Sequence, residues 1–75
     1  MVSVKFQRLA DLRCDHDLHQ KDVAEYLCMN KEVYGRYERG IREIPVWALL
    51  RLADLYHTST DYILGRTDNP SLPRA

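Results

Sequence analysis

Three charged residues close together in the sequence, Lys31, Glu32 and Arg36, have side chains that can read the edges of DNA bases. Lys and Arg donate hydrogen bonds to guanine in the major groove, and Glu accepts one from the cytosine amine. Their spacing places them on the outward side of a helix predicted over residues 31–39. Considered alone, the three residues are better explained as an ordinary solvated helix face, so other features of the chain must decide.

The predicted helix that carries these charges follows another short helix after a tight turn. The chain predicts helices over residues 20–27 and 31–39, with Asn30 as an N-cap and Gly40 as the residue that ends the second helix. Because the connection is so short, the two helices must cross at a steep angle, and the second must project from the surface. This is the arrangement of a helix-turn-helix.

Small and apolar residues fit the crossing of these two helices. Ala24 is small, as a close crossing requires, and Gly35 is predicted to face outward with the charged residues. Glycine lowers helix stability by about 1 kcal/mol relative to alanine, and a close approach to DNA would explain its presence. The seam beneath the pair is predicted to contain Val23, Leu27, Tyr34 and Tyr37.

Further helices and no strand are predicted in the rest of the chain, which gives five helices in total. Apolar spacing indicates a first helix over residues 2–14, and Pro45 suits the first position of a fourth helix over 45–56. Ser59 is the predicted N-cap of a last short helix, 60–64. The buried face of the fourth helix is predicted to consist of Val46, Leu49, Leu50, Ala53 and Tyr56, widened by Leu52 and Leu55.

Length and hydropathy restrict the class of protein. The 75 residues are enough for one small domain, predicted over residues 1–66, with 67–75 as an extended C-terminal tail that contains prolines. No apolar run approaches the roughly 20 residues that a membrane span needs. The N-terminus lacks a secretory pattern, so we expect a cytoplasmic protein with no membrane partner.

The charge balance by itself argues mildly against a nucleic-acid partner. The 11 Lys and Arg residues balance the 11 Asp and Glu residues, so the net charge is zero, whereas nucleic-acid binders are usually basic. The distribution is uneven, because residues 31–42 are rich in basic side chains and residues 11–25 are rich in acidic ones. This predicts one basic face for phosphate and weak non-specific affinity.

A resemblance to the Cro/cI repressor type of helix-turn-helix domain, also called the XRE family, extends over residues 4–66. It is carried by QKDVAEYLCMNKEVYGRYERG and IREIPVWALLRLADLYHTSTDYILGRTDNP, which include Gln20, Ala24, Leu27, the YERG element at 37–40, Leu52-Ala53 and the ending STDYILG at 59–65. The resemblance implies an all-α, five-helix, lambda-repressor-like DNA-binding domain with the helix-turn-helix at its second and third helices. It implies sequence-specific binding of double-stranded DNA by a transcriptional regulator, expected to be a repressor.

The resemblance also implies roles for individual residues. Those at the family's base-reading positions are Lys31, Glu32 and Arg36, and those at its DNA-backbone positions are Gln20, Asn30, Arg39 and Arg42. Gln20 is also expected to brace the recognition helix. Arg13 and Glu38 match a structural ion pair that links the first helix to the end of the third.

Some residues depart from the family's pattern. Cys28 stands where glycine is common, because the backbone there is left-handed, so a strained or altered turn is expected. His19 replaces the usual threonine cap, which predicts a weaker start of the second helix. Tyr34 is larger than the usual residue, and we expect it to push the recognition helix outward or to direct its hydroxyl to a phosphate.

A metal site is the competing interpretation of the residues near this turn. Cys14, His16, His19 and Cys28 have the right chemistry, but their spacing matches no standard zinc motif. Two cysteines also do not make a disulfide framework, so reduced thiols are expected. No metal or other cofactor is therefore predicted, although the sequence leaves the metal question open.

No catalytic motif is visible, so an enzyme is not expected. No small-molecule effector is evident either. One recognition helix gives too few base contacts to select a site in a genome, and we therefore expect a homodimer on a near-palindromic site. The interface is expected on the fourth and fifth helices and the tail, with Trp47, Tyr56 and Ile63 as candidates. The alternative is a protein-binding adaptor or antitoxin-like partner that uses the same fold.

Overall fold

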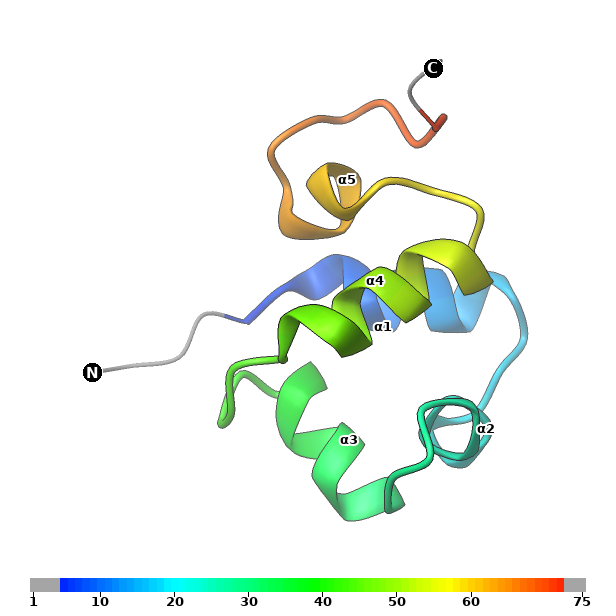
Figure 1. Cartoon of the computed structure of the whole chain (residues 1–75), viewed down its shortest axis with the longest axis vertical. Coiled ribbons are helices and arrows are strands. Elements are labelled where there is room, and N and C mark those ends of the chain that lie inside the picture. The colour runs from blue at the N-terminus through cyan, green and yellow to red at the C-terminus, as the bar shows by residue number, and fades with distance from the viewer. Residues whose placement is uncertain (1–4, 73–75) are drawn as a thin grey trace.

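The computed structural model describes residues 5–72, which form five α-helices and no strand (Figure 1). The helices are α1 (Gln7–Asp15), α2 (Gln20–Tyr26), α3 (Lys31–Glu38), α4 (Val46–Leu55) and α5 (Thr60–Leu64). The predicted all-α, five-helix fold is therefore confirmed for this part of the chain.

The helices are arranged so that α2 and α3 form one end of the molecule. α2 packs against α3, α1 contacts both α3 and α5, and α4 contacts α5. In Figure 1, α1 and α4 lie between α5 at the top and the α2–α3 pair at the bottom. The core that joins them consists mainly of Leu9, Val23, Ala24, Leu27, Tyr34, Ala48, Leu52 and Ile63, each almost fully buried.

Side chains and glycines define the helix ends much as the sequence indicates. Asn30 Oδ1 accepts a 2.8 Å hydrogen bond from the amide of Glu32 at the start of α3, and Ser59 Oγ accepts a 3.0 Å bond at the start of α5. Gly40, directly after the C-cap of α3, has a φ of 74°, a left-handed conformation that glycine adopts at little cost. These ends fix the length and direction of α3.

The first helix begins later than predicted. Of the predicted helix over residues 2–14, residues 2–4 lie outside the described part of the chain, and Lys5 and Phe6 are not helical. Phe6 is the N-cap of α1, with an extended backbone (φ −95°, ψ 97°), and its side chain packs against the core. The apolar residue thus marks burial rather than helix at this position.

The orientation of α4 differs from the prediction. Val46 and Leu50 are 71% and 53% exposed, and the buried face consists of Ala48, Leu49, Leu52, Ala53 and the following Tyr56. Pro45 is the N-cap of α4 and not its first helical residue. Because α4 has apolar residues on both sides, periodicity alone did not identify the face that packs against the core.

Two of the three residues predicted for a dimer interface are part of the core. Tyr56 is 5% exposed and Ile63 is 1% exposed, so neither is available to a partner, whereas Trp47 is 49% exposed. Trp47 lies beside Val46 and Leu50 on α4, and these three residues form the exposed apolar surface of that helix. We call this surface the α4 apolar face.

Arg8 attaches the segment after α5 to α1. Its guanidinium donates hydrogen bonds to the carbonyls of Tyr62 (2.8 Å) and Thr67 (2.6 Å) and forms a 2.7 Å ion pair with Asp68. It also lies over the Tyr62 ring, 4.0 Å from its centre. Farther along, the Thr58 hydroxyl donates a 2.6 Å bond to the carbonyl of Pro70. The segment 65–70 therefore runs along the body of the protein.

Candidate nucleic-acid interface

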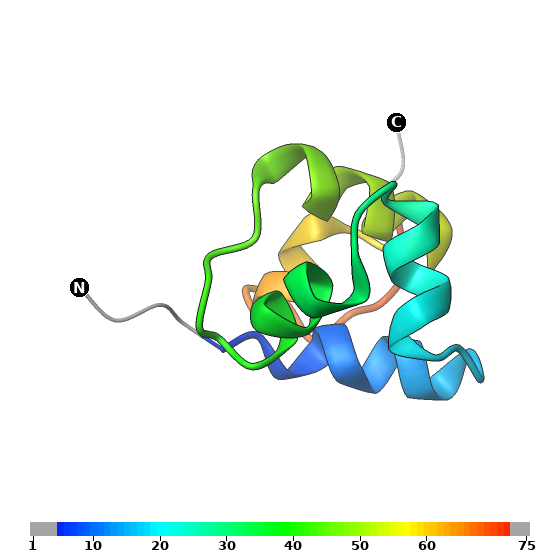
Figure 2. The ribbon, with the colours of Figure 1, turned by 90° about the horizontal axis from the view of Figure 1, so that it is seen from below.

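The side chains predicted to read DNA bases lie on the solvent side of α3. Lys31, Glu32 and Arg36 are all exposed, and none of them contributes to the core. Figure 2 views the molecule from the side on which α2 and α3 lie, and no other helix lies in front of α3 there. The arrangement leaves two donors and one acceptor free to meet base edges.

The charge exposed on and after α3 is mainly positive. Lys31, Arg36, Arg39 and Arg42 are exposed, and the one exposed acid among residues 31–42 is Glu32, because Glu38 is buried. On and after α1, and on α2, the exposed acids are Asp11, Asp15, Asp17 and Glu25. The zero net charge of the chain thus conceals a basic surface on the side of α3.

Glu38, at the end of α3, is held by side chains from α1 and α2. Arg13 Nε lies 2.7 Å from Glu38 Oε2, and Arg13 Nη2 donates to Oε1 at 3.2 Å. Gln20 Nε2 also donates to Oε1, at 3.1 Å, and Arg13 Nη1 donates to the carbonyl of Leu18. Glu38 is 5% exposed, so these bonds fix α3 against α1 and α2 from within.

The protonation of Glu38 is controlled by the same bonds. Burial alone would raise the pKa of the Glu38 carboxyl, but its hydrogen bonds, with Arg13 first among them, outweigh burial and lower the pKa. The bond to Glu38 likewise raises the pKa of Arg13. Both members of the pair are therefore charged at neutral pH.

This ion pair predicts a loss of stability in acid. Because the pKa of Glu38 is lower in the folded than in the unfolded chain, its contribution is complete above the unfolded value of about 4.3 and is lost as the pH falls through the folded value. The urea midpoint should therefore fall between about pH 6 and about pH 3, and it should fall less for Glu38→Gln. An equal fall in both proteins would contradict the role of Glu38.

Tyr34 is buried beneath α3 and does not face DNA. Its side chain is fully buried, and its hydroxyl makes no hydrogen bond of standard geometry within the described residues. Burial raises the pKa of Tyr34, as does the neighbouring Glu38 carboxylate. The expectation that the Tyr34 hydroxyl contacts a phosphate is therefore wrong, because the whole side chain is buried in the core. That the large ring displaces α3 outward stays a prediction.

Gly35 is also buried rather than outward-facing. Its surroundings are the side chains of Gln20 and Arg39, which approach the position that a Cβ would occupy. Helical spacing predicts Gly35 on the outer side of α3, but spacing does not show that two side chains lie over it. The glycine leaves room for the ends of these two side chains.

The turn between α2 and α3 keeps a left-handed residue although that residue is cysteine. Cys28 has a φ of 57°, and the adjacent amide of Met29 donates a 2.9 Å bond to the carbonyl of Ala24. At the start of α2, the amide of His19 donates a 2.9 Å bond to the Asp22 carboxylate. Asp22 thus supports the helix start that was expected to be weak.

Comparison with known proteins places this arrangement in a family. A family model described as "Helix-turn-helix" (HTH_3) matches residues 9–63. The chain belongs to this helix-turn-helix family. The predicted resemblance to the Cro/cI type of helix-turn-helix domain is therefore confirmed.

Individual relatives are similar over most of the chain. "Uncharacterized HTH-type transcriptional regulator YobD" of Bacillus subtilis is 45% identical over 64 residues, which cover 85% of this chain and 57% of the relative. "HTH-type transcriptional regulator ImmR" of the same organism is 37% identical over 62 residues, which cover 83% of this chain and 49% of the relative. The chain therefore spans about half the length of these curated relatives. A transcriptional regulator from Listeria innocua matches with a TM-score of 0.78 and 25% identity, covering 92% of this chain and 64% of that chain.

The candidate metal ligands do not come together in this helix-turn-helix domain. Cys14 and Cys28 are both exposed, free thiols, and His16 Nδ1 lies 2.9 Å from the carbonyl of Leu12. Among residues 5–72, no three His, Cys, Asp or Glu side chains are grouped as metal ligands would be.

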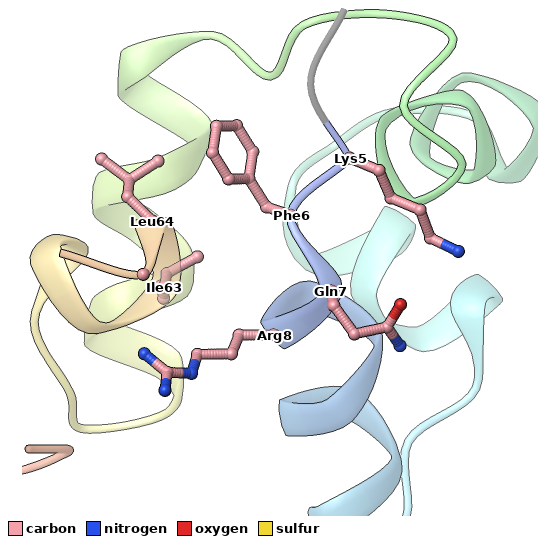
Figure 3. Close-up of a pocket in the computed structure, with 7 residues that line it drawn as sticks. Lys5, Phe6, Gln7, Arg8, Ile63 and Leu64 are labelled. Atoms are coloured by element: carbon pink, nitrogen blue, oxygen red, sulfur yellow. The ribbon is translucent and has the colours of Figure 1, made fainter. Parts of the chain in front are cut away.

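A pocket of about 290 Å³ opens between the start of α1 and α5 of the helix-turn-helix domain (Figure 3). Phe6, Ile63 and Leu64 make much of its wall apolar, and its charged lining residues are Lys5 and Arg8. Arg8 is engaged with Asp68 and two carbonyls. Within the described residues, no helix is long and apolar enough to cross a membrane.

The left-handed cysteine gives a prediction about stability. Replacing Cys28 by Gly should relieve about 1–2 kcal/mol of backbone strain, which exceeds the roughly 0.4–1 kcal/mol lost through the freer unfolded chain. Cys28→Gly should therefore melt a few degrees higher than the original chain, measured by circular dichroism. Cys28→Ser keeps the Cβ atom and should show no such gain. Melting of Cys28→Gly at or below that of Cys28→Ser would contradict the prediction.

Proposed function

We propose that this helix-turn-helix domain binds double-stranded DNA sequence-specifically and acts as a transcriptional repressor in the cytoplasm. The observation that carries the proposal is the division of α3 into two sides. Tyr34 and Glu38 anchor the inner side in the core, whereas Lys31, Glu32 and Arg36 occupy the outer side. A helix held rigidly from behind, with free donors and an acceptor in front, is suited to the major groove.

The proposed base contacts follow from the chemistry of these three side chains. Arg36 and Lys31 can each donate to the O6 and N7 atoms of guanine, and Glu32 can accept from the N4 amine of cytosine. Each good pair contributes roughly 1–3 kcal/mol of discrimination against the wrong base. We propose no cofactor, metal or small-molecule effector for this binding.

The proposed contacts to the DNA backbone come from Gln20, Asn30, Arg39 and Arg42. Asn30 uses its Oδ1 atom to cap α3, which leaves its amide nitrogen free to donate to a phosphate. Gln20 uses its nitrogen for Glu38, so one of its two N–H groups remains. Arg39 and Arg42 are exposed cations at the end of α3 and in the loop after it. Such contacts fix the position of the protein on the duplex and do not recognise the base sequence.

A second copy of the domain would supply the discrimination that one copy lacks. Three base contacts fall short of or barely reach the roughly 8 kcal/mol needed against about 10⁶ competing sites. We propose a homodimer on a near-palindrome whose half-sites lie about 34 Å apart, joined through the α4 apolar face. Val46, Trp47 and Leu50 together leave a contiguous apolar surface on a small domain, as association surfaces often do.

The proposed dimer gives a prediction for the α4 apolar face. Trp47→Asp should convert a dimer into a monomer, because it places a carboxylate in the apolar contact. The fold should survive, since Trp47 is half-exposed. Sedimentation at micromolar concentration measures the mass, with Ile41→Asp as a control at an exposed apolar residue outside this face. A persistent monomer for the unaltered chain would overturn the dimer.

A protein-binding adaptor or antitoxin-like partner is the alternative function, favoured by the same exposed α4 apolar face. Salt dependence separates the two. A DNA-binding domain with several phosphate contacts loses affinity steeply between about 50 and 200 mM salt. We expect this steep loss with a pool of duplexes, measured by fluorescence anisotropy. Flat dependence, or no binding at low salt, would favour the adaptor.

We also propose that the domain covers residues 1–66 and that residues 67–75 form a C-terminal tail. The contacts of Arg8 with Thr67 and Asp68, and of Thr58 with Pro70, attach the start of this tail to the domain. We propose that the tail is an extended segment lying on the domain as far as these contacts reach.

A further inference from the structure

Gly35 lies in the middle of α3, where two side chains cover it. A Cβ atom built on Gly35 would lie 3.3 Å from Nη1 of Arg39 and 3.4 Å from Oε1 of Gln20. The ends of these two side chains, one from α3 and one from α2, therefore converge on the space that a side chain at Gly35 would fill. We call this space the Gly35 notch.

The orientation of Gln20 in the notch is set from the core. The Glu38 carboxylate only accepts hydrogen bonds, so the nitrogen of the Gln20 amide must turn toward it, as the 3.1 Å bond from Nε2 shows. The amide oxygen of Gln20 borders the same space above Gly35 that Arg39 Nη1 borders. A guanidinium only donates hydrogen bonds, so an oxygen is the matching neighbour for it.

The notch leaves room for the Arg39 side chain, which is exposed to solvent, to lie over its own helix. An exposed arginine at a helix end samples many rotamers, and ordering it on binding costs conformational entropy. In this structure Arg39 Nη1 lies over its own helix, next to an α2 residue at the α2–α3 junction. A guanidinium held in one place can meet a phosphate with two parallel hydrogen bonds.

We propose that Gly35 is a positioning residue for DNA binding. The notch places the Arg39 guanidinium beside the Gln20 amide, so that both side chains donate hydrogen bonds to one phosphate group. The proposal rests on the proposed function. It explains why a glycine, an unfavourable residue inside a helix, stands in the recognition helix. Arg42, in the loop after α3, is a phosphate contact outside the notch.

Stability and binding should respond to Gly35 in opposite directions. Gly35→Ala favours the helix, and a contact of 3.3 Å with the end of a flexible side chain is relieved by a shift of a few tenths of an ångström. The melting temperature should therefore stay equal or rise. Affinity for a duplex should fall by roughly threefold, because the guanidinium is displaced from its aligned position. A purely structural glycine would not give this combination.

The deciding experiment compares Gly35→Leu, Arg39→Ala and the double variant on one fixed duplex at several salt concentrations. Gly35→Leu fills the notch and should, like Arg39→Ala, reduce affinity about tenfold and lower the salt slope by about one. The double variant should bind no worse than either single variant. Gly35→Leu with Arg42→Ala is the matched control, and there the two losses should multiply.

Several results would overturn the proposal. If the losses of Gly35→Leu and Arg39→Ala multiply, or if Gly35→Leu leaves the salt slope unchanged, the leucine acts by clashing with DNA and not through Arg39. If Gly35→Leu does not melt cooperatively, Gly35→Ala decides, and unchanged affinity in it overturns the proposal. Normal binding by the unaltered chain alongside such results leaves the proposed function standing. No salt-dependent binding by the unaltered chain overturns both.

Discussion

Replacing Glu38 by alanine is expected to unfold the domain. Glu38 and Arg13 are 5% and 17% exposed at their side chains, and removal of one member of such a pair typically costs about 3–5 kcal/mol. A single-core domain of this size has a net stability of only about 3–5 kcal/mol. Glu38→Ala also releases the Gln20 amide. The measurement is a thermal melt followed by circular dichroism, with no cooperative transition expected.

A double substitution distinguishes the lost ion pair from a merely damaged core. Arg13→Met with Glu38→Leu removes both charges and keeps apolar volume, a change that is often neutral or stabilising in buried pairs. This variant should recover a cooperative melt. Melting of Glu38→Ala near the temperature of the unaltered chain would show that the pair does not hold α3 in place.

Arg36→Ala and Arg42→Ala are expected to weaken DNA binding in different ways. Arg36 lies on the outer side of α3, so its loss should relax the preference at one base position, with a discrimination loss of about 1–3 kcal/mol. Arg42 lies after the helix and is proposed to contact a phosphate. Its loss should weaken all sequences alike and lower the salt slope by about one.

The measurement is a selection from random duplexes with each variant, followed by affinity for matched and mismatched sites. Both side chains are exposed, so neither substitution should lower the melting temperature, and a melt serves as the control. If Arg36→Ala lowered all affinities equally, or if Arg42→Ala changed the preferred sequence, the two proposed roles would be wrong.

The sequence predicted the fold of this domain well because its local signals agree. Asn30, Gly40 and Ser59 mark helix ends through short-range chemistry, and the structure shows each of them at such an end. The start of α1 was predicted incorrectly, and on α4 the predicted burial of Val46 and Leu50 was wrong, whereas Leu49, Leu52, Ala53 and Tyr56 are buried as predicted. In both places the local pattern of large apolar residues is ambiguous. Phe6 could be helical or extended, and Leu50 could be buried or exposed, and tertiary packing decides in each case.

The candidate site depends on interactions that no local pattern encodes. The pairing of Arg13 with Glu38 joins residues 25 positions apart, and its expectation came from the family resemblance rather than from spacing. The burial of Gly35 depends on where Gln20 and Arg39 direct their ends. The α4 apolar face around Val46 and Leu50 was likewise missed, although an excess of apolar residues in that helix was its signal.

Selection of binding sites from random double-stranded DNA, with the unaltered chain at physiological salt, tests the central proposal most directly. We predict enrichment of one near-palindromic sequence with half-sites about one helical turn apart, in which guanines and cytosines meet Lys31, Glu32 and Arg36. Recovery of no common sequence, with binding that does not respond to salt, would contradict the proposal that this domain reads DNA through α3.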